Sequence, residues 1–155
     1  MKKLLLFTAI IALTVSTASA QLRKTDATIA NEKNTIGVRV GYGADISYQR
    51  YLQSNNRIEA DLGFGYESSF DVSAIYQWLF GMKIDNVGFN WYAGLGAGLG
   101  VWEDNFAVSA VGQIGIEYKF NAPITLSLDW KPRLYMVPDL NFGWTGFGLG
   151  VRYRF

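Results

Sequence analysis

Two carboxylates stand two positions apart in the sequence, Glu59 and Asp61. Side chains two apart on a strand point to the same face, so this pair could share a proton as a catalytic carboxylate dyad does. Arginines expected on the same face instead favour two ionised carboxylates in ion pairs. The sequence has no histidine and no cysteine, and no Ser/Lys arrangement stands out that would supply another base. We therefore expect no catalytic residues and no enzymatic activity.

A run of glycines over 94–100, G-L-G-A-G-L-G, invites comparison with phosphate-binding loops. The dinucleotide fingerprint requires G-x-G-x-x-G, whereas these glycines recur at every second position. Alternate glycines leave one face of a strand without side chains, which makes room for long residues crossing from other strands. Glu103, Asp104 and Asn105 are adjacent and lack the spaced oxygen ligands of a calcium loop. We expect no cofactor-binding residues and no metal site.

Strands must position these residues, because apolar residues recur at every second position from Thr35 onward. Turn-forming residues divide this part of the chain into eight segments. Pro132 lies inside one segment, where it cannot donate a ladder hydrogen bond, so we expect a bulge or bend there. The expected strands are 35–42, 44–52, 57–67, 70–82, 89–102, 106–120, 124–137 and 142–155.

The composition of the polar face decides between two architectures that share this alternation. A soluble barrel or sandwich turns its apolar face inward, and a membrane barrel turns it outward. Here the polar face is poor in charge and rich in glycine and serine, which suits a crowded interior better than a solvated exterior. The aromatics gather toward strand ends with aliphatics between them, as in two interfacial girdles. The expected girdle residues are Tyr42, Phe64, Tyr66, Trp78, Phe80, Trp91, Phe106, Tyr118 and Phe120.

An even number of strands can close a barrel without a free edge, which a bilayer requires because unpaired backbone groups find no water there. We therefore predict an all-β fold over 35–155, an eight-stranded antiparallel up-and-down transmembrane β-barrel with short connections. Its interior should hold a polar network, since charges of both signs fall on the inner face and an eight-stranded barrel is about wide enough for its side chains to fill. The alternative is a narrow wet path that selects small ions. The expected network residues are Arg39, Glu59, Asp61, Glu117, Lys119, Asp129, Lys131, Arg133, Arg152 and Arg154.

The N-terminus has a basic start, an apolar core over 4–15 and the small-residue sequence A-S-A at 18–20. This pattern is typical of a cleavable signal peptide, here residues 1–20, and the apolar core is shorter than the roughly 20 residues of a membrane-spanning helix. Residues 21–34 are polar and without periodicity, so we expect a flexible periplasmic tail. Both termini should then be periplasmic, in the outer membrane of a Gram-negative bacterium. A net charge of +1 gives no indication of nucleic-acid binding.

The chain ends in V-R-Y-R-F, with Val151, Tyr153 and Phe155 at alternate positions, and this is similar to the assembly signal of outer-membrane barrels. The segment 35–155 resembles the small eight-stranded outer-membrane β-barrel family that includes the OmpX-like proteins and the OmpA transmembrane domain. The resemblance implies the fold and the location, and it implies no defined activity. The short outward connections depart from the better-known members. The stretches similar to an uncharacterised branch of such barrels are G-F-N-W-Y-A-G-L-G-A-G-L-G (88–100), G-I-E-Y-K-F (115–120) and L-S-L-D-W-K-P (126–132).

These observations favour a non-enzymatic integral outer-membrane protein with a plugged, salt-bridged interior and a role in envelope integrity. Its expected partners are outer-membrane lipid and the barrel-assembly machinery, and we expect a monomer. One alternative is a porin-like channel for ions or very small solutes, suggested by the glycine-rich inner faces of the fifth and eighth strands. A second is a surface binding module that uses exposed strand ends, which the short loops make least favourable.

Overall fold

The computed structural model describes residues 33–53, 55–65, 69–81, 88–102 and 105–155. The predicted signal peptide and most of the predicted tail lie outside these residues, as does Tyr66. Among the described residues there is no helix long and apolar enough to span a membrane. The strands are β1 (Asn34–Gly41), β2 (Gly43–Gln53), β3 (Asn56–Gly65), β4 (Phe70–Gly81), β5 (Phe89–Trp102), β6 (Asn105–Lys119), β7 (Ile124–Trp130), β8 (Arg133–Val137), β9 (Asn141–Gly143) and β10 (Phe147–Arg154).

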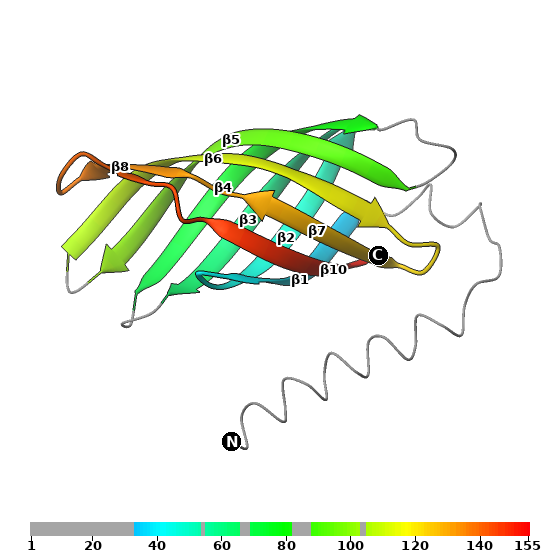
Figure 1. Cartoon of the computed structure of the whole chain (residues 1–155), viewed down its shortest axis with the longest axis horizontal. Helices are drawn as coiled ribbons and strands as arrows, with labels where there is room; N and C mark the ends of the chain where they lie inside the picture. The colour runs from blue at the N-terminus through cyan, green and yellow to red at the C-terminus, as the bar shows by residue number, and fades with distance from the viewer. Residues whose placement is uncertain (1–32, 54, 66–68, 82–87, 103–104) are drawn as a thin grey trace, which may run out of the picture.

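Antiparallel pairing between strands that follow one another in the chain closes the sheet into a barrel of tilted strands (Figure 1). From β1 to β6 each strand pairs with the next, β6 pairs with β7, and β10 pairs with both β7 and β1. β7 with β8 forms the seventh strand of the barrel, and β9 with β10 forms the eighth. The prediction of an all-β, closed, eight-stranded, up-and-down antiparallel barrel is confirmed.

The seventh barrel strand is broken at Lys131 and Pro132, where a single strand over 124–137 was expected. Its register against β6 is the same on both sides of the break, since Ile114 is opposite Trp130 and Val111 is opposite Arg133. The Gly112 N–H donates to the Pro132 carbonyl over 2.9 Å, and proline has no N–H with which to return the bond. The irregularity expected at Pro132 is thus an in-register break in the strand.

The eighth barrel strand is also broken, although 142–155 was predicted as one strand. β9 and β10 are separated by residues 144–146, and the Lys131 N–H donates to the Gly146 carbonyl over 2.8 Å. A Cβ atom at Gly146 would lie 2.1 Å from the Lys131 carbonyl oxygen, so only glycine fits this close approach. The two breaks therefore lie side by side in the wall.

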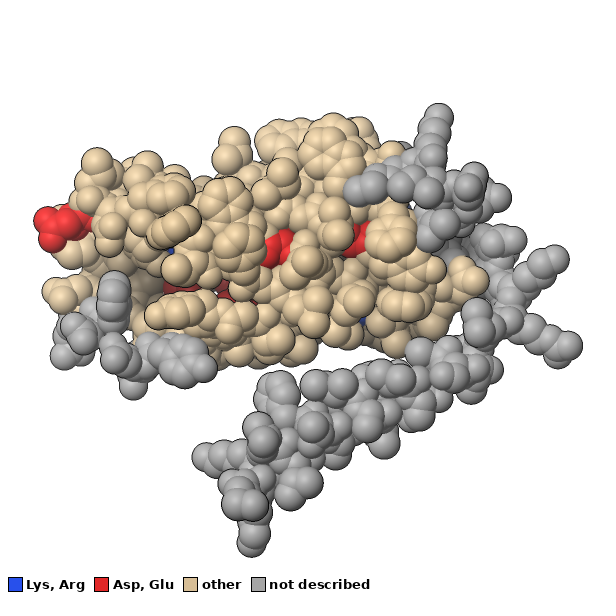
Figure 2. Space-filling model, in the orientation of Figure 1, with Lys and Arg blue, Asp and Glu red and all other residues tan. Residues whose placement is uncertain are grey.

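Side chains alternate between the two faces of the wall, and the face that points outward is apolar. Along β10, exposed and buried residues alternate one by one, with glycine and arginine buried. Of the charged residues in the described part of the chain, only Lys33, Arg50 and Asp139 are exposed. Figure 2 accordingly shows a face made almost entirely of uncharged side chains. The end of the barrel with Asn34 and Phe155 is called the proximal end, and the end with the β1–β2 turn at Tyr42 is called the distal end.

Candidate functional site

The interior of the barrel holds a network of charged and polar side chains that runs from the proximal toward the distal end. All ten residues predicted for it point inward. Lys119 and Arg133, which lie toward opposite ends, are half-buried. The fully buried members are Arg39, Glu59, Asp61, Glu117, Asp129, Lys131, Arg152 and Arg154.

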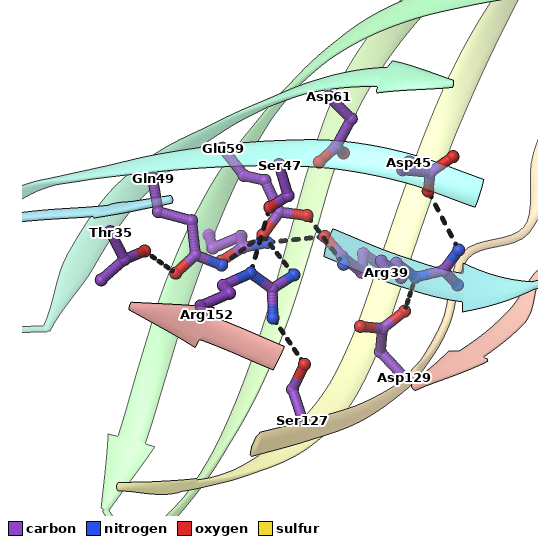
Figure 3. Close-up of polar contacts among 12 residues, drawn as sticks. Thr35, Arg39, Asp45, Ser47, Gln49, Glu59, Asp61, Ser127, Asp129 and Arg152 are labelled. Carbon is purple, nitrogen blue, oxygen red and sulfur yellow. Dashed lines mark hydrogen bonds and ion pairs between the residues drawn. The ribbon is translucent and has the colours of Figure 1, made fainter. Parts of the chain in front are cut away.

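Arg39 on β1 is held between two carboxylates in the distal half of the network (Figure 3). Its Nε donates to Asp129 over 2.7 Å and its Nη1 to Asp45 over 3.1 Å. Its Nη2 donates to the Gly146 carbonyl at the break in the eighth strand, over 2.6 Å. The second oxygen of Asp129 accepts a hydrogen bond from the Tyr92 hydroxyl over 2.8 Å. Arg39 thus joins β1, β2 and β7 and fixes the backbone where the wall is irregular.

Lys131 crosses the barrel from the break in the seventh strand. Its ammonium lies 2.7 Å from Asp61 on β3 and 3.3 Å from Asp45 on β2. The strand pairing puts the seventh barrel strand directly opposite the third. The Lys131–Asp61 ion pair therefore spans the full width of the lumen.

Arg152 occupies the middle of the lumen beside Glu59 (Figure 3). Its Nη2 lies 3.2 Å from Glu59, its Nε donates to Ser47 over 3.0 Å, and its Nη1 donates to Ser127. Glu59 also accepts hydrogen bonds from Gln49 and, over 3.1 Å, from Gln113. The short side chains of Ser47 on β2 and Ser127 on β7 thus leave space for one long arginine and satisfy two of its nitrogens.

Another buried ion pair lies closer to the proximal end, between Arg57 on β3 and Glu117 on β6. The Arg57 Nη1 donates to Glu117 over 2.6 Å, and neither side chain is exposed to solvent. Arg57 also donates to Gln77, and its guanidinium lies over the Tyr92 ring, 4.8 Å from the centroid. Lys119, which lies nearer the proximal opening, places its ammonium nitrogen 3.5 Å from the Glu117 carboxylate.

Arg154 closes the proximal end by binding backbone oxygens. It donates to the carbonyls of Phe120, Ala122 and Ile124 over 2.8 to 3.0 Å and to the Thr125 hydroxyl over 2.9 Å. These acceptors belong to the connection between β6 and β7 and to the first residues of β7. Arg154 therefore ties the end of the chain to the neighbouring hairpin.

Each carboxylate of the possible catalytic dyad, Glu59 and Asp61, is paired with a cation. Glu59 lies with Arg152, whereas Asp61 lies with Lys131 and accepts a hydrogen bond from Ser73 over 3.5 Å. Lys131 also lies 4.0 Å from Glu59, so it links the two carboxylates. In the described part of the chain, no group of three or more acidic residues could hold a metal ion. The arrangement is one of ion pairs across a lumen.

The sequence prediction left out several members of this network whose side chains also point into the lumen. Arg57 shares the parity of Glu59 on one strand, and Tyr92 shares the parity of the alternating glycines on β5. Strand parity alone would have found them. The additional buried or half-buried members are Asp45, Gln49, Arg57, Asp71, Gln77, Tyr92 and Gln113.

The predicted girdle and assembly-signal residues lie on the outer face. Phe80 stacks on Trp91 with ring centroids 4.2 Å apart, and Tyr118 contacts Phe120 edge-on at 4.6 Å. Tyr118 and Phe120 are half-exposed. The exposed members of the two sets are Tyr42, Phe64, Trp78, Phe80, Trp91, Phe106, Val151, Tyr153 and Phe155.

A cavity of about 380 Å³ opens at the distal end, above the network. Charged groups of both signs line it, namely Arg39, Asp45, Asp71, Lys131 and Arg133. The ion pairs of Arg39 and Lys131 close its floor. The cavity is therefore a blind recess.

Comparison of the chain with protein-family models, with curated proteins and with solved structures finds no match.

Proposed function

We propose that this chain is a non-enzymatic integral protein of a bacterial outer membrane, with a plugged polar lumen and a role in envelope integrity. The observation that carries the proposal is the reversed polarity of the barrel. Buried arginines, lysines and carboxylates fill the inside, while leucine, isoleucine, valine and aromatic side chains are exposed along the strands. A water-soluble barrel has the opposite arrangement, because burial of apolar surface is what stabilises it.

The few exposed charges agree with a hydrocarbon layer around the middle of the wall. Lys33 directly precedes β1, Asp139 lies between β8 and β9, and Arg50 is near the proximal end of β2. Long cationic side chains near a membrane boundary can extend to the interface. Backbone pairing around the closed barrel leaves few polar groups to face lipid, as a bilayer requires.

The plugged lumen is the reason for preferring a structural role over transport. Lys131–Asp61 joins opposite strands, and Arg57–Glu117 and Arg152–Glu59 each join strands three places apart around the barrel. Removal of either partner from such a buried pair leaves an uncompensated charge, at a cost of about 3–5 kcal/mol. A static plug of this kind leaves no continuous water path through the middle of the barrel.

The first test is localisation and folding. The full chain is expressed in a Gram-negative host, membranes are fractionated, and the purified protein is run on gels with and without heating. We expect the protein in the outer-membrane fraction, dependent on detergent, with a compact unheated form that migrates faster than the heated form. A monomer that stays in solution without detergent would overturn the membrane assignment.

The second test separates the plug from a narrow pore for ions or very small solutes, which the charged distal cavity favours as the second candidate. Single-channel recording in planar bilayers should give no discrete conductance for the folded barrel. Conductance steps that vary with salt concentration would instead support the pore.

The envelope role is tested in the native cell. Deletion of the gene should raise sensitivity to detergents and to large antibiotics, and a copy of the gene should restore resistance. Unchanged sensitivity would remove the envelope role and leave the membrane location standing.

A further inference from the structure

The wall of the barrel lacks a strand partner at one place, along the free edge of β9. β9 pairs with β8, and no other described strand lies at its second edge. β1 runs beside β10 as far as Gly41, which is opposite Gly148. To continue beside residues 143–146, β1 would have to extend further, but the chain turns at Tyr42 into β2. A gap thus lies between the β1–β2 turn and β9.

The distal cavity lies behind this gap. Its lining includes Tyr42 and Gly43 on one flank and Gly143, Thr145 and Gly146 on the other. The cavity lining therefore borders the unpaired edge of β9 as well as the distal end of the barrel. Because its floor is closed by ion pairs, a molecule that enters must also leave at this end, which is the behaviour of a binding site.

Apolar and aromatic side chains surround the lateral gap on the outer face. Tyr42 is 71% exposed and Trp144, which directly follows β9, is 68% exposed. A ligand at this position would have one part in a charged recess and another against apolar surface, so its chemistry is that of an amphiphile.

Arg133 is the cation in the recess with donors to spare. Arg39 is bound to two carboxylates and donates to a backbone carbonyl, and Lys131 lies within 4.0 Å of three carboxylates. Arg133 donates only from Nη2, to Asp71, and its Nε and Nη1 have no acceptor among the described residues. Asp71 orients the guanidinium and leaves Nε and Nη1 free to donate to a phosphate oxygen.

We propose that the distal cavity binds the phosphate-bearing headgroup of a membrane lipid, which enters laterally between the β1–β2 turn and β9 with its acyl chains outside, and that Arg133 binds the phosphate. The unused donors of Arg133 favour an anionic headgroup. The cavity volume falls in the range of roughly 300–1,000 Å³ that is usual for ligand sites. The inference rests on the proposed membrane location.

The test uses protein expressed from the full chain, purified from membranes and held in a neutral detergent. Short-chain phosphatidic acid is the probe, titrated by calorimetry. Two matched compounds accompany it: glycerol phosphate has the phosphate without chains, and short-chain diacylglycerol has the chains without phosphate. We expect saturable binding of phosphatidic acid and at least tenfold weaker binding of both other compounds.

The variants are Arg133→Gln, Arg133→Lys and, as the matched control, Arg50→Gln. R133Q should weaken phosphatidic acid binding at least tenfold. R133K should weaken it by less, because the positive charge stays although the guanidinium donors are lost. R50Q should leave binding unchanged. Gly143→Phe fills the recess from the β9 flank and should also abolish binding. The heat-dependent gel shift of each variant shows that it is folded.

Several outcomes would overturn the inference. Equal binding of glycerol phosphate would show that the recess takes free phosphate from water, and equal binding of diacylglycerol would show apolar adsorption. Equal affinities of R133Q and R50Q would remove Arg133 as the phosphate ligand. These failures are separate from failure of the membrane assignment, which appears as a chain without the gel shift or the need for detergent.

Discussion

At the scale of single residues, Lys131 and Arg152 each bind a carboxylate of β3 from a distant strand of the barrel. The two-residue period assigns Glu59, Asp61 and Lys131 to the lumen, because strand geometry is local. That Lys131 pairs with Asp61, and Arg152 with Glu59, depends on which strands lie across the barrel and on the stagger between them. The sequence pattern therefore gave no ion pairs, and the predicted set left out members such as Arg57.

A substitution of Arg57 tests how much a buried ion pair contributes to the free energy of unfolding. Arg57→Met should lower the free energy of unfolding by about 3–5 kcal/mol, because Glu117 then loses its buried cation and keeps only the half-buried Lys119 at 3.5 Å. The measurement is urea-induced unfolding in lipid vesicles. The matched control is Arg50→Met, the same change at an exposed arginine, which should alter stability little. Equal losses in the two variants would contradict the assignment of Arg57 to a buried ion pair.

At the scale of elements, one of the two strand breaks can be predicted from the sequence and the other cannot. The break at Pro132 follows from the missing N–H of proline, which is visible in the sequence itself. The break between β9 and β10 depends on the contact of Gly146 with the carbonyl of Lys131 on a neighbouring strand. Glycines are frequent on the inner faces, so nothing in the local sequence distinguishes Gly146 from Gly148 or Gly150.

The break in the seventh strand should be repairable by one substitution. In Pro132→Val the new N–H faces the Gly112 carbonyl and can return the hydrogen bond that Gly112 already donates. We expect a gain of about 0.5–1.5 kcal/mol in stability. The new amide at position 132 should also be protected in hydrogen exchange. Rapid exchange at this amide would show that the adjacent break, and not the proline, sets the geometry.

At the scale of the whole molecule, the closed barrel was predictable because strand number, alternation and short connections all agree. Closure itself depends on the last strand, since β10 pairs with both β1 and β7. Phe155 and Asn34 exchange backbone hydrogen bonds of 2.9 and 3.1 Å at the seam. Signal peptide and location remain predictions from the sequence.

Phe155 should contribute more to barrel assembly than Phe147, an exposed phenylalanine in the same C-terminal segment. Phe155→Ser should reduce the fraction of chain that reaches the compact form in membranes several-fold, because it alters both the seam and the predicted assembly signal. Phe147→Ser, at an exposed phenylalanine at the other end of β10, is the control and should have a smaller effect. The readout is the proportion of the unheated, fast-migrating species in membranes. A larger loss for F147S than for F155S would place the decisive contact at the distal end.

The contacts that fill the lumen join residues that are far apart in the sequence. Asp61 meets Lys131 across 70 residues of chain, and Ser47 meets Arg152 across 105. Such non-local contacts form late, because the entropy of closing long loops must be overcome first. A partly built sheet therefore carries charged side chains whose oppositely charged partners lie on strands that have not yet paired. Such a sheet stays in contact with water until β10 pairs with β1 and β7. Charge neutralisation and barrel closure are then a single, final step.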